Sequence, residues 1–189
     1  MKKIIVIGLL VLSNLSIAQG PIISLSEYDL NTEYTPNMYI SDIDGLFNPF
    51  VGTWEWTNGN ETLTIVLYKV PQVHTTVGER TFYCDELYGK YKYEQNGTTI
   101  INTIDNVEPT IAIKGFKPQG NKVEFLFDDT ILEKQGFLEV ELINAFGLAK
   151  INLKLINRKG VSFILQGDSN YIDDFSIPHN ENFVLSKVN

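Results

Sequence analysis

Residues 48–57 read Asn48-Pro49-Phe50-Val51-Gly52-Thr53-Trp54-Glu55-Trp56-Thr57. In an extended chain Gly52, Trp54 and Trp56 share one face, whereas Thr53, Glu55 and Thr57 share the other. A face that carries two tryptophans is buried, and a face of threonines and a glutamate is wet. Glycine lets the chain bend tightly at the point where the strand begins. The segment therefore predicts a half-buried first strand, Gly52–Thr57, whose Trp54 ring closes one end of a core.

The same period-two alternation continues through the rest of the chain. Further strands are predicted at Glu61–Val70, Thr81–Leu87, Tyr88–Glu94, Thr98–Ile104, Thr110–Phe116, Lys122–Phe127, Leu138–Leu142, Lys150–Leu155, Val161–Gln166 and Phe183–Val188. Turn residues separate them, at Asn58-Gly59-Asn60, Asn96-Gly97, Pro118-Gln119-Gly120, Lys159-Gly160 and Gly167-Asp168. Beyond residue 18 only three alanines occur, which disfavours helices. We expect an all-β chain with a single antiparallel barrel of about eight to ten strands over residues 49–189; a two-sheet β-sandwich is the alternative.

Gly52-Thr53-Trp54 resembles the G-x-W motif that opens the first strand of lipocalins and other calycins. The avidin-like order is similar too, because a later G-x-Y follows at Gly89-Lys90-Tyr91. The wider pattern also resembles a family of small exported bacterial proteins of unknown function, with an acidic lead-in, a G-T-W strand and a G-x-Y-x-Y segment. The resemblance implies a lipocalin-like barrel in which Gly52, Thr53, Trp54 and Gly89 are structural, and it implies no activity.

Two lipocalin features are missing from the sequence. No segment matches the T-D-Y-like loop motif of that family. Lipocalins also place an arginine near the last strand to pack on the tryptophan, but the two arginines here are Arg80 and Arg158. The residues with which avidin contacts biotin do not map onto this chain, so the resemblance does not predict biotin binding.

The first 18 residues, Met1–Ala18, have the layout of a secretory signal peptide. Lys2 and Lys3 precede an apolar run from Ile4 to about Ile17, and small residues stand before a cleavage point at Gln19. The apolar run is shorter than the roughly 20 residues of a membrane-spanning helix, so an uncleaved anchor is the weaker interpretation. We expect export to the periplasm or the exterior, and no transmembrane span.

Residues 19–48 form an acidic lead-in that contains no lysine or arginine. Ser41–Phe47 is predicted to form a short capping helical turn, with Ser41 as its N-cap. Asp42-Ile43-Asp44-Gly45 is only part of a calcium loop, because the glutamate required at position 12 is replaced by Thr53.

The formal net charge is −8, and it becomes −10 without Lys2 and Lys3. Nucleic-acid binding through phosphate contacts needs clustered lysine and arginine, so that class of function is excluded.

Catalytic and metal-binding patterns are weak throughout the chain. His74 and His179 are predicted in exposed loops, without the converging partners of a metal site or a triad. The carboxylate pairs are Asp85-Glu86, Asp128-Asp129 and Asp173-Asp174. Adjacent acids on a strand point to opposite faces, so one pair cannot flank a glycosidase cleft. We expect no enzyme activity, no cofactor and no metal site.

Cys84 is the only cysteine, so no intrachain disulfide can form. A small buried core residue that alternates with Phe82 is the favoured interpretation; an intermolecular disulfide or a reactive thiol is the alternative.

Several aromatic residues are candidates for the lining of a ligand pocket. They are Trp54, Trp56, Tyr68, Tyr91, Tyr93, Phe125, Phe127 and Phe163. An eight-stranded barrel is just wide enough to be filled by side chains or to hold one small ligand. The primary hypothesis is a non-enzymatic exported protein that binds a small apolar or amphipathic molecule at Trp54, Trp56, Tyr91 and Tyr93. The alternative is a solid-core module that acts through protein interaction or association with the envelope.

Overall fold

The computed structural model describes residues 20–29, 31–105, 112–115, 117–145, 148–157, 174–179 and 181–188. These residues form strands and turns and no helix, and hence no helix that could cross a membrane. The strands are β1 (Ile22–Ser24), β2 (Tyr39–Ser41), β3 (Gly52–Asn58), β4 (Glu61–Val77), β5 (Arg80–Gln95), β6 (Thr98–Asn102), β7 (Ile113–Gly115), β8 (Lys122–Asp129), β9 (Lys134–Ala145), β10 (Leu148–Ile156) and β11 (Asn182–Val188).

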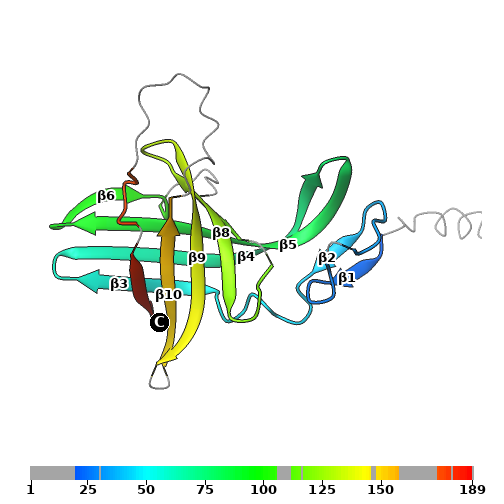
Figure 1. Ribbon diagram of the computed structural model, residues 1–189, viewed down its shortest axis with the longest axis horizontal. Helices are drawn as coiled ribbons and strands as arrows, with labels where there is room; N and C mark the ends of the chain where they lie inside the picture. The colour runs from blue at the N-terminus through cyan, green and yellow to red at the C-terminus, as the bar shows by residue number, and fades with distance from the viewer. Residues whose placement is uncertain are drawn as a thin grey trace, which may run out of the picture.

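Eight of these strands close into an antiparallel barrel (Figure 1). The barrel runs β5-β4-β3-β11-β10-β9-β8-β7, and the pairing of β7 with β5 completes the circle. The prediction of an all-β antiparallel barrel is confirmed, and the sandwich alternative is wrong, because a sandwich keeps open edges whereas this sheet closes on itself.

Turn residues make the tight connections, as the sequence predicts. Gly59 joins β3 to β4 with a φ of 62°, and Asn96 and Gly97 join β5 to β6 with φ of 53° and 73°. Positive φ at both central residues gives the turn a twist that matches the twist of the flanking strands.

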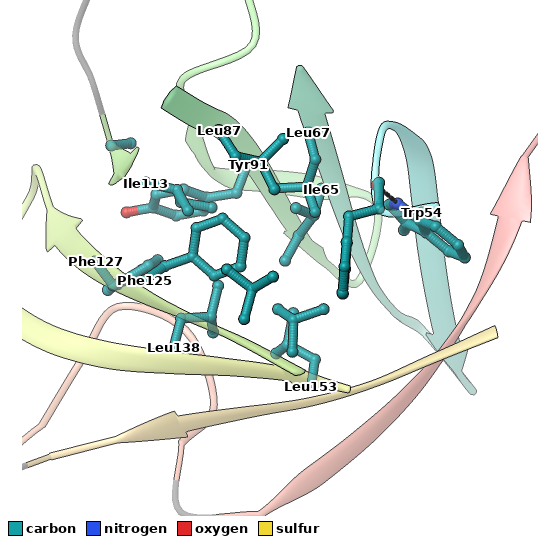
Figure 2. Packing of buried hydrophobic residues seen from close by; sticks show 14 of the residues in the cluster. Trp54, Ile65, Leu67, Leu87, Tyr91, Ile113, Phe125, Phe127, Leu138 and Leu153 are labelled. Atoms are coloured by element: carbon teal, nitrogen blue, oxygen red, sulfur yellow. Dashed lines mark hydrogen bonds between the residues drawn. The ribbon is translucent and has the colours of Figure 1, made fainter. Parts of the chain in front are cut away.

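Apolar side chains from all eight barrel strands fill the interior. Figure 2 shows several of them, among them Tyr91, Phe125 and Leu138, pointing toward one another. The apolar residues of the barrel strands that are no more than 1% exposed are Trp54, Leu63, Ile65, Leu67, Leu87, Tyr91, Ile113, Phe125, Phe127, Leu138, Val140, Ile151, Leu153, Leu155, Phe183 and Leu185. A side chain beside a void as large as a water molecule would keep accessible surface there. Their near-zero exposure therefore means that protein atoms surround these side chains.

The pairing of β7 with β5, which closes the barrel, depends on two glycines, Gly89 on β5 and Gly115 on β7. A methyl group at Gly89 would lie 2.8 Å from Leu67 Cδ2 and 3.1 Å from Ile113 Cβ. A methyl group at Gly115 would lie 2.5 Å from the Phe125 ring. Only glycine permits this close approach, so both glycines are structural residues of the β5–β7 pairing.

Strands β4 and β5 extend beyond the barrel as a hairpin, which Figure 1 shows projecting from the barrel body. Thr81–Leu87 and Tyr88–Glu94 are therefore one strand, not two as predicted, because alternation continues without a break at residue 88. Strands β1 and β2 lie parallel to each other and to the first half of β5, so part of the lead-in is ordered. We call the four-stranded extension, formed by β1, β2, residues 70–77 and residues 80–86, the arm.

The expected helical turn over Ser41–Phe47 is wrong. Ser41 ends β2, and residues 43–44 and 46–50 form successive turns. The side chain that caps them is Asp42, whose Oδ1 accepts the Leu46 N–H at 2.6 Å. Since Ser41 is held in the β2 ladder, the capping position moves one residue along the chain.

Several predictions fall outside the described residues. They are the signal peptide at Met1–Ala18, the strand at Val161–Gln166, the turns at Lys159-Gly160 and Gly167-Asp168, Phe163, Asp173 and Arg158.

Candidate functional site on the arm

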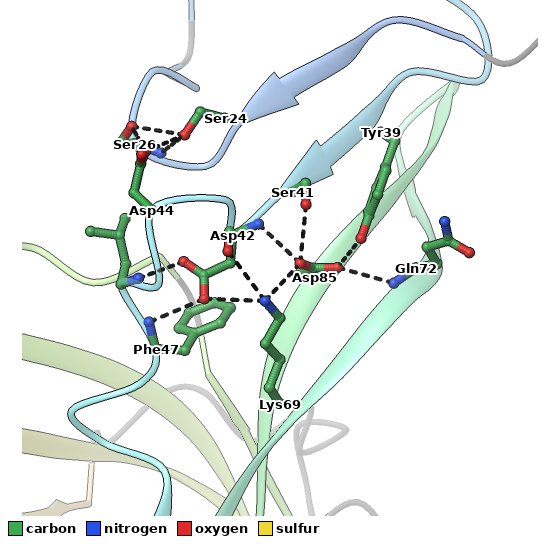
Figure 3. A network of polar contacts seen from close by, with 11 residues as sticks. Ser24, Ser26, Tyr39, Ser41, Asp42, Asp44, Phe47, Lys69, Gln72 and Asp85 are labelled. Atoms are coloured by element: carbon green, nitrogen blue, oxygen red, sulfur yellow. Dashed lines mark hydrogen bonds and ion pairs between the residues drawn. The ribbon is translucent and has the colours of Figure 1, made fainter.

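A network of buried polar groups lies where the arm leaves the barrel (Figure 3). Asp85, on β5, is at its centre and is only 4% exposed. Its carboxylate accepts hydrogen bonds from the Tyr39 hydroxyl, from the Asp42 N–H at 2.9 Å and from the Gln72 N–H at 3.2 Å. Gln72 donates because the β-bulge between Val70 and Val73 turns its N–H toward Asp85, with a positive φ of 53°.

Lys69 links this carboxylate to a second one. Its Nζ lies 3.1 Å from Asp85 Oδ2 and 3.4 Å from Asp42 Oδ2. Burial alone would raise the pKa of Asp85, but the hydrogen bonds to its carboxylate outweigh burial and hold the pKa below its ordinary value. Burial alone would lower the pKa of Lys69, but the two carboxylates outweigh it and raise the pKa. Asp85 and Lys69 are therefore both stabilised in their charged forms, and with Asp42 they form the ion triad Asp42–Lys69–Asp85.

Asp42 also ties the triad to the chain segment that enters the barrel. Its carboxylate accepts the Leu46 and Phe47 N–H groups, and Phe47 itself is 1% exposed within the core. On β5 the same face carries Tyr91 and Leu87 in the barrel, then Asp85 in the triad. The triad thus marks the point where the apolar barrel interior ends and the arm begins.

The neighbouring acid, Glu86, belongs to a separate network on the opposite face of β5. Its carboxylate lies 3.0 Å from Lys114 Nζ and accepts the Thr75 hydroxyl at 2.9 Å. Cys84 lies beside them, 9% exposed, and burial raises the pKa of its thiol to about 11. The favoured interpretation of Cys84 as a small buried residue beside Phe82 agrees with this placement. Asp85 and Glu86 thus lie inside a strand and on its opposite faces, as the sequence predicts for adjacent acids.

Beyond the triad, the arm face carries one row of side chains across its four strands, three of them exposed and one, Tyr39, half-buried. Ile22 pairs with Tyr39, Tyr39 pairs with Tyr83, and Tyr83 pairs with His74. Directly paired residues point to the same face of a sheet. Ile22 is 57% exposed, Tyr83 is 38% exposed, and the Tyr83 and His74 ring centroids are 5.3 Å apart. We call these four residues the aromatic row.

The first-strand motif opens β3, where Gly52 pairs with Leu67 and Trp54 pairs with Ile65 of β4. The Trp54 indole N–H donates to the Phe50 carbonyl at 2.8 Å, and Lys187 Nζ lies 5.2 Å from the centroid of its ring. Gly52 has a φ of 139°, and a methyl group there would lie 2.6 Å from Lys187 Cε. Lys187, on the last strand, thus packs on the tryptophan in the manner expected of the missing arginine.

The four predicted ligand-binding aromatics belong to the barrel wall and core. Trp54 and Tyr91 share one cross-strand row through Ile65, and Trp56 and Tyr93 share the next. Tyr91 stacks on Phe127 at 4.8 Å, Trp56 meets Phe183 edge-on at 4.9 Å, and Tyr93 donates to Glu61 at 2.8 Å. Each of the four rings therefore has a protein partner.

The two histidines differ from their predicted positions. His74 is exposed but lies in β4 rather than in a loop. His179 is in a loop, but its side chain is only 15% exposed and packs on Phe175 at 5.4 Å. Among the described residues, no three histidine, cysteine, aspartate or glutamate side chains gather into a possible metal site.

Sequence reasoning missed the triad and the aromatic row. The available signal was the unbroken alternation of Tyr83, Asp85, Leu87 and Gly89 along one strand face. This face is buried in the barrel at Leu87, but it continues outside the barrel, where it carries the Asp85 carboxylate and then the exposed Tyr83 ring. Splitting β5 into two strands hid this continuity.

Comparison with curated proteins and with solved structures returned no match. A family match covers residues 1–188, nearly the whole chain. The protein therefore belongs to DUF6705, a family of unknown function, and it adds to that family the geometry of a closed eight-stranded barrel with an arm.

Proposed function

We propose that this protein is an exported, non-enzymatic binding module that uses a solid barrel as a scaffold and recognises its partner through the arm. The filled barrel interior carries this proposal. A small ligand among Trp54, Tyr91 and Phe127 would have to displace side chains that are at most 1% exposed. This packing favours the solid-core alternative over a ligand held inside the barrel.

The arm has the features that a binding face needs. It presents apolar and aromatic side chains to solvent, and such side chains dominate contact energies. Behind them the Asp42–Lys69–Asp85 triad fixes β2, β4 and β5 to one another, so the face is held rigid before binding. The layout of residues 1–18 supports export, and the buried carboxylates Asp85 and Glu86 are already paired with lysines, which supports a non-enzymatic role.

Site-specific photo-crosslinking in the native host tests the location of binding. A photoreactive phenylalanine analogue replaces Tyr83 in one variant and Ile100 in another. Ile100 is the matched control, because it is 40% exposed on β6, outside the arm. We expect a covalent adduct from position 83 and none from position 100. Equal adducts at both positions, or none at position 83, contradict recognition through the arm.

Native mass spectrometry of the protein purified from its own cells tests the solid core. We expect the same mass under native and denaturing conditions after correction for solvent. A co-purified molecule that is released on denaturation, and whose occupancy falls in a Tyr91→Phe variant, would overturn the solid-core proposal in favour of an interior ligand.

A further inference from the structure

The chemistry of the arm face is more specific than a generic apolar patch. The aromatic row crosses four strands, and with neighbouring strands about 4.8 Å apart it extends about 15 Å. Two tyrosines, a histidine and an isoleucine form this line. The arm face thus presents three rings and an isoleucine in one line across its strands, with the His74 and Tyr83 rings tilted by 61° to each other.

Hydrogen-bonding groups border the row on both sides. Thr76 and Thr81, paired with each other and both exposed, lie on the side of the hairpin tip. Ser41 and Gln72 lie on the side of the barrel, next to Asp85. The row is therefore an apolar strip between two strips of hydroxyl and amide groups.

Charge narrows the class of ligand. Asp85 is neutralised by Lys69, and Arg80 at the hairpin tip lies over the Tyr34 ring at 5.7 Å. The charged side chains beside the aromatic row, Asp85 and Arg80, thus already contact Lys69 and the Tyr34 ring. The whole chain has a formal net charge of −8. A polyanion would be repelled by the protein's overall field and would find little compensation at the row.

On these grounds we propose that the aromatic row binds a neutral saccharide chain. Each sugar ring has an apolar C–H face that stacks on an aromatic ring and a rim of hydroxyls that bonds to side chains such as those of Thr76, Thr81 and Gln72. The rings of Tyr83 and His74 provide the stacking surface, and Tyr39 is held in place by its hydrogen bond to Asp85. This inference rests on the proposed function, because it names the ligand of the same arm face.

Affinity electrophoresis of the full protein tests the inference. The gels contain one soluble neutral polysaccharide each (xylan, mannan, dextran or a mixed-linkage β-glucan), and polygalacturonate is the anionic comparison. We expect at least one neutral polysaccharide to retard the protein, with no change in retardation when 0.5 M NaCl is added, because salt screens charges but not ring stacking.

Variants at the row decide whether the retardation comes from this face. Tyr83→Ser and His74→Ala replace exposed side chains, so both variants should keep the melting temperature of the wild type. We expect each to weaken binding about tenfold, the loss typical of one stacked ring. Ile100→Ser, of matched exposure, should bind like the wild type.

Three outcomes overturn the saccharide inference: no retardation by any neutral polysaccharide, retardation by polygalacturonate alone with loss in salt, or full binding by the Tyr83→Ser variant. The crosslinking experiment separates this inference from the proposed function. A protein adduct at position 83, without saccharide binding, would refute the saccharide and leave the arm as the binding face.

Discussion

Replacing Lys69 with methionine tests whether the triad holds the arm to the barrel. The Lys69 side chain is 31% exposed, whereas the side chains of its partners, Asp42 and Asp85, are 0% and 2% exposed. The substitution keeps most of the aliphatic stem but leaves two neighbouring carboxylates buried without a cation. Removing one partner of a fully buried pair costs about 3–5 kcal/mol, and partial access of water to Lys69 reduces this to about 2–3 kcal/mol.

The chain offers a matched control at Lys92. Its Nζ lies 2.8 Å from Glu94 Oε1, and its side chain is 30% exposed, nearly the value for Lys69, but Glu94 is 32% exposed. Because water solvates Glu94 once the lysine is gone, Lys92→Met should cost at most about 1 kcal/mol. In urea unfolding, with a typical slope of about 2 kcal/mol/M, Lys69→Met should lower the midpoint by about 1 M relative to the wild type.

The effect of Lys69→Met should also depend on pH. The native pKa of Asp85 lies below the ordinary 3.8, so its contribution to stability is present above that pH and is lost as pH falls through the native pKa. The native pKa of Lys69 lies above the ordinary 10.5, so its contribution is present below that pH and is lost as pH rises through the native pKa. The difference between Lys69→Met and the wild type should therefore be largest near neutrality and shrink toward pH 3. A Lys69→Met cost equal to that of Lys92→Met, or one that is constant from pH 3 to pH 8, would refute the reasoning.

Three further predictions concern the core. Gly89→Ala puts a methyl group 2.8 Å from Leu67 Cδ2, so it should lower the free energy of unfolding in urea by about 1–3 kcal/mol; unchanged stability would mean that β7 can move away freely. Burial raises the pKa of the Cys84 thiol to about 11, so mass spectrometry should show that the thiol resists iodoacetamide at pH 8 until the protein unfolds. The stability that is linked to the neutral thiol is present below the ordinary thiol pKa of 9.0 and is lost as the pH rises toward 11. Rapid alkylation of the native protein would contradict the burial of Cys84. Trp54→Phe removes the N–H donor to the Phe50 carbonyl and part of a ring that is 0% exposed. It should therefore lower the free energy of unfolding by about 2–4 kcal/mol in thermal unfolding, and an unchanged melting temperature would show that the indole is dispensable.

The strand content and the fold class could be predicted because both depend on local patterns. Alternation in Lys122–Phe127 and in Lys150–Leu155 shows which side chains are buried, and the same residues lie in β8 and β10. Gly59 and Gly97 mark hairpin turns because positive φ is a property of the residue itself. The interpretation of Gly52-Thr53-Trp54 as a strand that starts with a bend holds for the same reason.

The arm could not be predicted from local patterns. Strands β1 and β2 are three residues each, and neither has a turn partner beside it in sequence. Strand β2 forms because β5 offers it an open edge, and β1 then pairs with β2. The triad joins residues 42, 69 and 85, whose side chains meet only after β4 bulges and β2 docks. The alternation of Asp85 and Glu86 shows that they point to opposite faces of one strand, but it does not show which residues of other strands will contact them.

The sequence by itself therefore determined the all-β class, the turns, the first-strand motif and the acidic charge, since each follows from the period, the propensity or the composition of a short segment. Tertiary structure alone decided that the barrel closes between β7 and β5, that its interior is filled, and that Ile22, Tyr39, Tyr83 and His74 line up across the arm. The physical reason is distance along the chain: side-chain packing, ion pairing and exposure depend on residues far apart in sequence, and the alternation of one strand does not reveal which neighbour will cover it.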